Sequence, residues 1–574
     1  MDYKEKYEYW LNDPYFDDEV REELESIKDD EDEIKDRFYK DLEFGTAGLR
    51  GIVGYGSNRI NKYTVAKASQ GIAEYVLESS DSEVKTASIA YDGRLKADEF
   101  ALTAARVFAA NGIKTYLYDS VRPTPQASFT VRRLGTDTGV MMTASHNPPE
   151  YNGYKAYGSD GAQYSTTDSG KITEKFNAIK SYEEIKIISE EEAREKGMIV
   201  SVPDYVDDEY VDNVLSLTLR DDDIDKDINI VYTPLHGVGA EKVLKVLGKR
   251  GFSNVHIVEE QAEPDGRFPT LTYPNPEDLK AFELSEKLAE KVSADIIIAT
   301  DPDTDRVAAL VRDGEEYKSI SGNEMGYLLM DYILTERKKK GNIPEDGVLV
   351  KTIVSSRFAE YIAEDYGIEC RDSYTGFKNI AKVIREMENA QDGEYIFGYE
   401  ESIGYLPETF ARDKDAVSAT MLIAEMAAAY KKDGINLLDR LEELFKTYGY
   451  FEEKLYSVIM TGIEGRMKID KLMEIFRTDY PKEIAGHSVV DVKDYLSQKG
   501  YKDGETYDLG FDEKENAVKY IFDDGSWYVM RPSGTEPKIK IYIYSTKNDK
   551  ISAKNRIDDI SSVIDDIIKK VEEE

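Results

Sequence analysis

Four short polar segments hold the residues that could carry chemistry, and the first is TASHNPPEYNGYKAY (143–157). It places a hydroxyl, Ser145, beside an imidazole, His146, with an amine, Lys155, ten residues further on. Because the apolar run 139–142 precedes it, we expect a buried strand that ends in a loop carrying all three groups. Ser145 could be a hydrolase nucleophile, a phosphate carrier or an ordinary turn residue. The residues that flank Ser145 lack the glycines of a Gly-x-Ser-x-Gly elbow, which weakens the hydrolase hypothesis.

The second segment, ATDPDTDR (299–306), alternates three carboxylates within five residues: Asp301, Asp303 and Asp305. It follows an apolar run, so the carboxylates are expected at the end of a strand, where α/β proteins place ligands. It is not an EF-hand, because the twelfth position is Arg312 and the sixth is not glycine. So few carboxylates from so short a loop favour Mg²⁺ that shares its coordination shell with a phosphate oxygen.

The third and fourth segments offer groups that bind sugars and phosphate. GYEESIGY (398–405) places two carboxylates and a hydroxyl between glycines, which suits vicinal sugar hydroxyls and equally suits a plain turn. RPSGTEPKIKIY (531–542) combines a Ser-Gly-Thr turn with Arg531 and Lys538, which predicts a phosphate site without a helix N-terminus. It does not match the Walker A pattern.

Composition restricts the partners that the chain can have. The 574 residues include 114 acidic and 75 basic ones, and the resulting net charge of −39 argues against nucleic acid and anionic membranes as partners. A phosphate site must therefore be locally basic, as residues 531–542 are. The single cysteine excludes an intrachain disulfide, and neither a signal peptide nor a long apolar segment is evident, so we expect a cytoplasmic protein.

Helical and strand patterns alternate from residue 60 onward, which predicts an α/β fold. Three such runs precede a last part with a different pattern, a helix near 464–477 followed by strands and a terminal helix. We expect three similar mixed α/β domains and a C-terminal α+β domain. The expected domains are 1–205 with the serine loop, 206–322 with the metal loop, 323–448 with the sugar loop and 449–574 with the phosphate loop.

Together the four segments describe phosphoryl transfer to and from a phosphosugar. In order, FGTAGLRG (44–51), TASHNPP, DPDTDR, EESIG and RPSGTEP also occur in one known family. On these motifs the chain resembles the α-D-phosphohexomutases, the phosphoglucomutase/phosphomannomutase superfamily, over nearly its whole length.

The resemblance implies four domains around a central cleft, and it assigns a role to each motif. Ser145 would be the phosphoserine and would share one Mg²⁺ per chain with Asp301, Asp303 and Asp305. Lys155 would be the general acid/base, with Arg50 nearby and His146 beside the phosphoserine. The residues that would bind the sugar or its phosphate are Glu400, Ser402, Lys378, Arg531, Ser533, Gly534, Thr535 and Lys538.

The implied reaction interconverts glucose 1-phosphate and glucose 6-phosphate through glucose 1,6-bisphosphate. The EESIG form favours glucose over mannose, while the long chain also resembles the branch that contains phosphopentomutases and glucose-1,6-bisphosphate synthases. A non-catalytic phosphosugar sensor is a further alternative, against which the intact Ser145, three aspartates and Lys155 argue. The expected assembly is a monomer or a homodimer.

Overall fold

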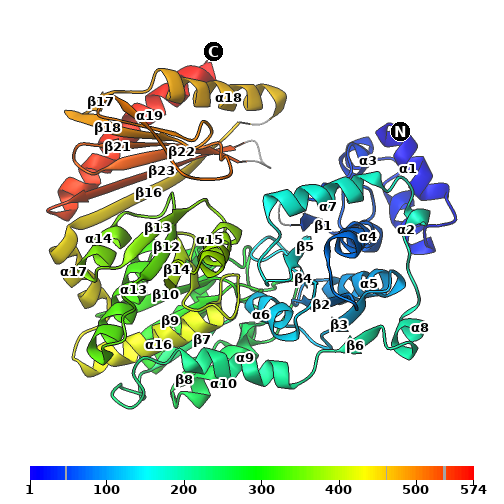
Figure 1. Ribbon diagram of the computed structural model, residues 1–574, viewed down its shortest axis with the longest axis horizontal. Coiled ribbons are helices and arrows are strands. Elements are labelled where there is room, and N and C mark those ends of the chain that lie inside the picture. The colour runs from blue at the N-terminus through cyan, green and yellow to red at the C-terminus, as the bar shows by residue number, and fades with distance from the viewer. Residues whose placement is uncertain (46–47, 461, 534–537, 574) are drawn as a thin grey trace. The chain divides into compact units, whose positions relative to one another are not determined.

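The computed structural model describes residues 1–45, 48–460, 462–533 and 538–573, without the side chains of 462 and 463 (Figure 1). The chain divides into two compact units. Unit 1 comprises Met1–Thr352 and Ala363–Leu437, and unit 2 comprises Ile353–Ile362 and Leu438–Glu574.

The first sheet of unit 1 has the strand order β1-β5-β4-β2-β3-β6. Strands β4, β2, β3 and β6 are parallel, whereas β5 runs antiparallel to β4 and β1. The strands are β1 (Gly48–Ile52), β2 (Thr86–Tyr91), β3 (Lys114–Leu117), β4 (Thr138–Met142), β5 (Tyr151–Gly158) and β6 (Ile199–Ser201). The helices of this segment are α4 (Lys62–Ser79), α5 (Ala97–Ala110), α6 (Thr124–Leu134), α7 (Thr166–Ala178), η1 (Tyr182–Glu184), α8 (Glu190–Glu195) and α9 (Tyr205–Ser216).

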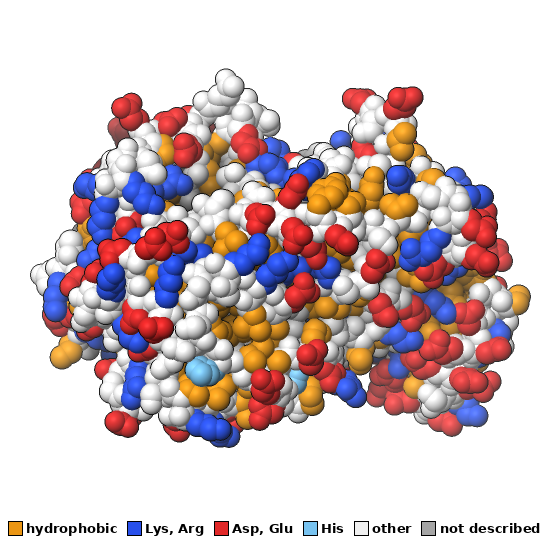
Figure 2. Space-filling view, turned by 90° about the horizontal axis from the view of Figure 1, so that it is seen from below, with side chains coloured by type: hydrophobic (Ala, Val, Ile, Leu, Met, Phe, Trp, Pro, Cys, Tyr) orange, Lys and Arg blue, Asp and Glu red, His pale blue; other side chains and the backbone are white. Residues whose placement is uncertain are grey.

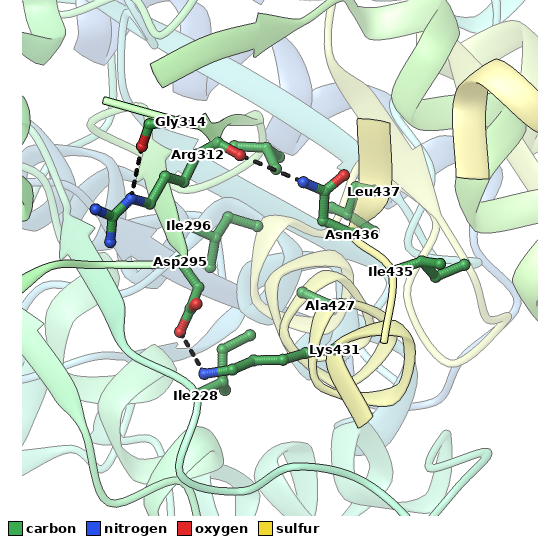
Figure 3. Close-up of a pocket in the computed structure, with 11 residues that line it drawn as sticks. Ile228, Asp295, Ile296, Arg312, Gly314, Ala427, Lys431, Ile435, Asn436 and Leu437 are labelled. Carbon is green, nitrogen blue, oxygen red and sulfur yellow. Dashed lines mark hydrogen bonds and ion pairs between the residues drawn. The ribbon is translucent and has the colours of Figure 1, made fainter. Parts of the chain in front are cut away.

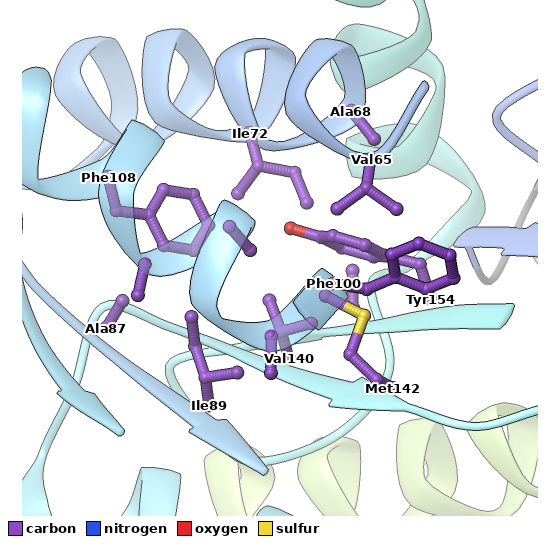
Figure 4. Packing of buried hydrophobic residues seen from close by; sticks show 14 of the residues in the cluster. Val65, Ala68, Ile72, Ala87, Ile89, Phe100, Phe108, Val140, Met142 and Tyr154 are labelled. Atoms are coloured by element: carbon purple, nitrogen blue, oxygen red, sulfur yellow. The ribbon is translucent and has the colours of Figure 1, made fainter. Parts of the chain in front are cut away.

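The core of this sheet anchors the residues that flank the serine loop (Figure 4). Helices α4 and α5 contribute Ile72 and Phe108, which pack above Val140 and Met142 of the fully buried strand β4. Tyr154 of β5 lies in the same cluster. Close packing allows such a core little freedom, so the chain on both sides of the serine loop is held firmly.

The second sheet of unit 1 has the order β11-β10-β9-β7-β8. Its central strand β9 is fully buried and pairs parallel with β7 and antiparallel with β10. The elements are β7 (Ile230–Thr233), α10 (Gly239–Lys249), β8 (Val255–Ile257), α11 (Glu259–Ala262), η2 (Leu279–Phe282), α12 (Glu283–Val292), β9 (Ile296–Thr300), β10 (Val307–Asp313) and β11 (Glu316–Ile320).

The third sheet of unit 1 has the order β13-β12-β14-β15, with β15 antiparallel to β14. Its elements in unit 1 are α13 (Gly322–Lys340), β12 (Gly347–Thr352), β13 (Glu369–Ser373), α15 (Phe377–Ala390), β14 (Glu394–Glu400), β15 (Gly404–Leu406) and α16 (Ala416–Lys432). Most of α14 (Phe358–Asp365) and all but the first residue of α17 (Leu437–Tyr448) belong to unit 2.

Unit 2 contains an eight-stranded antiparallel sheet on which α18 and α19 pack (Figure 1). Its path is β16-β23-β22-β21-β18-β19-β20, and β17 pairs with β18. The elements are β16 (Tyr450–Ile459), α18 (Gly462–Thr478), β17 (Glu483–Ile484), β18 (His487–Asp494), β19 (Lys499–Lys502), β20 (Glu505–Asp508), β21 (Val518–Phe522), β22 (Trp527–Pro532), β23 (Lys538–Lys547) and α19 (Lys550–Glu573).

These elements confirm the predicted α/β class, with three α/β segments before a sheet of different topology. The four domain boundaries and the central cleft stay predictions. The structure adds three N-terminal helices that we did not predict: α1 (Tyr3–Asn12), α2 (Asp18–Ser26) and α3 (Glu31–Phe38). They enclose an aromatic cluster in which Trp10 stacks on Phe16 with ring centroids 4.4 Å apart.

One prediction of irregular structure is wrong. Lys155 lies on strand β5 and not in a loop, because the strand pairs with β1 over 151–155 and with β4 over 154–158. The segment 312–325, within which the expected boundary after residue 322 lies, includes the β10–β11 hairpin and the start of α13. Strand β11 lies at the sheet edge and is polar, which hides the alternation typical of a strand.

Charge is distributed in a mixed pattern on the face shown in Figure 2, where acidic and basic side chains intermingle. No helix among the described residues is long and apolar enough to cross a membrane.

Candidate active site

The Ser145 loop begins where β4 ends, and its backbone holds the hydroxyl in one position. Ser145 has a φ of 52°, a left-handed conformation that non-glycine residues rarely adopt. Its N–H donates to Oγ1 of Thr143 at 2.8 Å, which stabilises this conformation. The buried hydroxyl Oγ donates to Asp301 Oδ2 at 2.7 Å and lies 3.2 Å from His146 Nδ1. The serine and metal segments, 156 residues apart in the chain, are thus in direct contact.

Arg94 holds this loop through hydrogen bonds to its backbone. Its buried guanidinium donates to the carbonyl of Ser145 at 2.6 Å and also to the carbonyls of Asn147, Pro148 and Tyr151. The Nε atom lies 3.7 Å from the buried carboxylate of Asp92. The planar fork of an arginine reaches several acceptors at once, so one side chain fixes the path of the whole loop.

Lys155 connects the first sheet to the metal loop. Its Nζ donates to Asp303 Oδ2 at 2.7 Å and to Asp305 Oδ2 at 2.8 Å. Burial by itself would lower the pKa of Lys155, but the two carboxylates raise it well above its ordinary value. Lys155 is therefore held as an ammonium group.

The metal loop follows the buried strand β9, and several segments of unit 1 fix it. Asp301 Oδ1 accepts the N–H groups of Asp305 and Arg306, both at 3.0 Å, which closes the loop on itself. The N–H of Thr124, at the start of α6, donates to the carbonyl of Asp303, and the Thr124 hydroxyl donates to its carboxylate. Thr304, at the tip, has a φ of 56°.

The three aspartates fit a divalent cation. One carboxylate oxygen of each lies within 4.8 Å of those of the other two, and all three residues are buried. Within the described part of the chain, Oδ1 of Asp303 and of Asp305 accepts no hydrogen bond, and an orphaned buried acceptor requires a partner. Burial and the neighbouring carboxylates raise the pKa of Asp301 well above its ordinary value, because they disfavour its charged form. A bound cation would favour the charged form and lower this pKa. Three hard oxygen donors match Mg²⁺ or a similar ion.

A second buried ammonium, Lys414, was missed by the sequence analysis. Its Nζ lies 3.2 Å from Asp305 Oδ2 and 3.4 Å from Asp413 Oδ1. Burial would lower the pKa of Lys414, whereas Asp305 and Asp413 raise it above its ordinary value. The charged run at 412–415 just before the buried helix α16 could have indicated it, because ionic residues rarely enter a core without a partner.

The predicted sugar loop follows β14 and contacts the metal loop. The carbonyl of Ile403 accepts the N–H of Val307, so the two loops are joined. Glu400 is buried, and its Oε1 accepts the N–H of Gly376 at 2.7 Å. Ser402 is partly exposed in the turn that follows. The negative charge of Glu400 also contributes to the raised pKa values of Arg306 and Lys414.

Three further residues of unit 1 were predicted to belong to the site: Arg50, His146 and Lys378. Arg50 is exposed on β1 and donates to Asn147 Oδ1 of the serine loop at 3.2 Å. His146 is next to Ser145, and burial together with Arg306 lowers its pKa well below the ordinary value, which leaves the imidazole neutral. Lys378 lies at the start of α15, where its Nζ is 3.3 Å from the Thr166 hydroxyl. Arg50 and His146 thus belong to the serine loop, whereas the Thr166 hydroxyl, which Lys378 approaches, lies at the start of α7.

The predicted phosphate segment belongs to unit 2. Arg531 lies near the end of β22, where its Nε donates to Glu515 Oε1 at 2.7 Å. Ser533 donates its N–H to the carbonyl of Lys538, the first residue of β23. Gly534 and Thr535, the other two predicted phosphate ligands, lie outside the described residues.

Comparison with protein families gives four consecutive matches. The three α/β/α domains of phosphoglucomutase/phosphomannomutase match residues 41–183, 208–314 and 321–448, and the C-terminal domain matches 478–555. The chain belongs to the phosphoglucomutase/phosphomannomutase family. The predictions of this family and of a phosphohexomutase, an isomerase, are confirmed. The individual site residues remain assigned by geometry and motif alone.

Individual relatives of this phosphohexomutase cover most of its length. The phosphoglucomutase of Staphylococcus epidermidis is 39% identical over 512 residues, which are 88% of this chain and 90% of the relative. That of Staphylococcus aureus is 38% identical over 515 residues, 89% of this chain and 91% of the relative.

Solved structures share the fold at low identity. The phosphoglucomutase pp63/parafusin of Paramecium, in its open form, superposes with a TM-score of 0.68 at 18% identity, over 92% of this chain and 96% of that one. A family member from Burkholderia thailandensis gives 0.65 at 16% identity, over 92% and 97%.

Proposed function

We propose that this phosphohexomutase is a phosphoglucomutase that interconverts glucose 1-phosphate and glucose 6-phosphate with Ser145 as phosphoryl carrier. The observation that carries the proposal is the contact between the Ser145 hydroxyl and a buried triple-aspartate loop, which Lys155 bridges. A serine beside hard-cation ligands and a fixed ammonium has the parts that phosphoryl transfer needs.

In the forward half-reaction, the free hydroxyl oxygen of the sugar attacks the phosphorus of phosphorylated Ser145. A P–O bond to the sugar forms and the P–O bond to Ser145 breaks. The Ser145 oxygen takes a proton from the Lys155 ammonium group, and the proton that the sugar hydroxyl loses restores that ammonium. Glucose 1,6-bisphosphate results. It must turn over before its other phosphoryl group returns to Ser145, with the same bonds made and broken in reverse.

The residues around Ser145 supply charge and proton handling. Lys155 and Lys414 are both held protonated beside Asp305, so each can neutralise negative charge that develops on the transferring group. Lys155, as an ammonium, can also give a proton to the departing serine oxygen. The neutral His146 offers Nδ1 to the serine hydroxyl at 3.2 Å.

Asp301, Asp303 and Asp305 would hold one Mg²⁺, with Ser145 or its phosphate completing the shell. When bound, Mg²⁺ would act as a Lewis acid on the phosphoryl oxygens. The positions of the three carboxylates are set by the backbone of the loop, by Thr124 and by Lys155.

Substrate recognition is assigned to the two other loops. Glu400 and Ser402 would bind sugar hydroxyls, since Glu400 is fixed by the backbone of Gly376 and adjoins the metal loop through Ile403. Arg531, Ser533, Gly534, Thr535 and Lys538 of unit 2 would hold the phosphate that is not being transferred, and Lys378 would assist. We further propose a cytoplasmic enzyme that works as a monomer or a homodimer.

The choice of glucose is supported by the phosphoglucomutase relatives and by the EESIG segment. A coupled assay would follow hexose 6-phosphate formation from glucose 1-phosphate and from mannose 1-phosphate, and ribose 5-phosphate formation from ribose 1-phosphate, with Mg²⁺ and the matching bisphosphate. We expect the highest kcat/KM with glucose 1-phosphate. A preference for mannose or ribose would reassign the enzyme as a phosphomannomutase or phosphopentomutase, and no turnover of any would favour a sensor.

A further inference from the structure

A cavity of about 370 Å³ lies in the second sheet of unit 1, away from the residues assigned to catalysis (Figure 3). Ile296 and Val311, which are paired across β9 and β10, form part of its wall. Ala427 and Lys431 of α16 and the segment 435–437 line another side. Its volume is that of a small-molecule site.

The cavity and the metal loop lie at opposite ends of the same strand. Ile296 begins β9, and Asp301 directly follows its end. Five residues of extended chain separate the two positions, which is about 17 Å. A molecule in the cavity therefore does not occupy the substrate site, and the cavity has no part in the mechanism described above.

The walls of the cavity combine an apolar lining with charged groups. Apolar residues contribute most of the lining: Ile228, Ile296, Val311, Ala427, Ile435 and Leu437. Asp295 and Lys431 also reach it and form an ion pair of 2.8 Å, and Lys431 Nζ lies 3.5 Å from Asp225 as well, so the lysine is occupied by carboxylates of the protein. The side chain of Arg312 is the remaining charge.

Arg312 has donors that the protein does not use. Its Nε donates to the carbonyl of Gly314 at 3.0 Å, which orients the guanidinium, as Figure 3 shows. Across the described residues, Nη1 and Nη2 of Arg312 donate no hydrogen bond, and no carboxylate oxygen lies within 4 Å of them. In a protein with a net charge of −39, a guanidinium without a carboxylate beside an apolar cavity is an unusual feature.

We propose that this cavity, the Arg312 pocket, binds a small amphiphile with one anionic group, a carboxylate, sulfonate or phosphate, on an apolar body. The apolar body would occupy the space between Ile296 and Ala427, and the anion would accept hydrogen bonds from the free Nη groups of Arg312. Guanidinium groups bind such anions in a bidentate way, which gives strength and orientation together.

Two fluorescent probes with the same type of apolar body distinguish the contribution of the anionic group to binding from that of the apolar cavity. 8-Anilinonaphthalene-1-sulfonate carries an anion, whereas N-phenyl-1-naphthylamine does not. With the full-length Mg²⁺-loaded enzyme, we expect one saturable sulfonate site whose affinity is unchanged by saturating glucose 1,6-bisphosphate.

Three variants then test the assignment. Arg312→Leu should weaken the sulfonate about tenfold, equivalent to about 1.4 kcal/mol, and leave the uncharged probe within twofold. Ala427→Leu fills the cavity and should weaken both probes. Lys318→Leu is the matched control, because it removes one charge from an exposed position on β11 that does not line the cavity, and it should change neither affinity.

Three results would overturn the proposal: displacement of the sulfonate by glucose 1,6-bisphosphate, unchanged binding in Arg312→Leu, or unchanged binding of both probes in Ala427→Leu. Circular dichroism of each variant shows whether it is folded. These readouts do not depend on turnover, so they stand or fall separately from the proposed mutase activity.

Discussion

Replacement of Arg94 by lysine tests whether the serine loop is positioned by a single guanidinium. Arg94 donates from Nη1 and Nη2 to four backbone carbonyls, and an ammonium group has one nitrogen atom at a single point. The lysine of Arg94→Lys keeps the charge opposite Asp92 but can reach about two of the four carbonyls. At about 1 kcal/mol for each lost hydrogen bond, the variant should lose about 2 kcal/mol of stability.

The catalytic effect should be larger than the stability effect suggests. A misplacement of about 1 Å in a reacting group can reduce a rate by about 10²-fold. We therefore expect kcat of Arg94→Lys to fall about 10²-fold while KM for glucose 1-phosphate changes little, because Arg94 contacts the loop backbone. Urea unfolding and the coupled assay measure the two quantities on one preparation.

The matched control is Arg250→Lys. Arg250 is also buried and donates three hydrogen bonds from Nη1 and Nη2, to Asp221, Arg220 and Glu425, none of which belongs to the serine or metal loop. It should lose a similar free energy of unfolding and keep kcat within about twofold. The reasoning is refuted if Arg94→Lys retains kcat, and a rise in KM without a change in kcat would show instead that Arg94 binds the substrate phosphate.

Three further predictions concern the groups around the metal loop. Gly404→Ala should reduce kcat about tenfold in steady-state assays and leave KM unchanged. The new Cβ would lie 2.2 Å from Lys414 Cδ and would have to displace that side chain. Full activity would show that the position of Lys414 is unimportant. Lys414→Met should lower kcat by about 10²-fold in the same assay, and a smaller loss than in Gly404→Ala would contradict its assigned role. Asp303→Asn should raise the Mg²⁺ concentration needed for half-maximal activity by about 10-fold or more, and an unchanged Mg²⁺ titration would remove Asp303 from the ligand set.

The sequence was informative wherever a chemical group follows a buried strand. Strands β4 and β9 are fully buried, and the polar residues that follow them, near Ser145 and Asp301, lie where the prediction placed them. The reason is physical: a buried parallel strand must be apolar, so the first polar residues after it lie at the edge of the sheet.

Other parts of the site could not be predicted because they depend on contacts between distant segments. Lys155 was expected in a loop, since Asn, Gly and Pro around it are typical of turns, but pairing of β5 with two strands overrides that local preference. Lys414 approaches Asp305 only after α16 packs beside the second sheet. The role of Arg94 likewise depends on four carbonyls more than 50 residues away in the chain.

The most direct test of the account is the intact mass of the Mg²⁺-loaded enzyme after incubation with glucose 1,6-bisphosphate. The wild-type chain should gain one phosphoryl group, about 80 Da, located on Ser145 by peptide mapping, and Ser145→Ala should gain none. A wild-type chain that is never phosphorylated, or a Ser145→Ala variant that gains the same mass, would contradict the central claim that Ser145 carries the phosphoryl group.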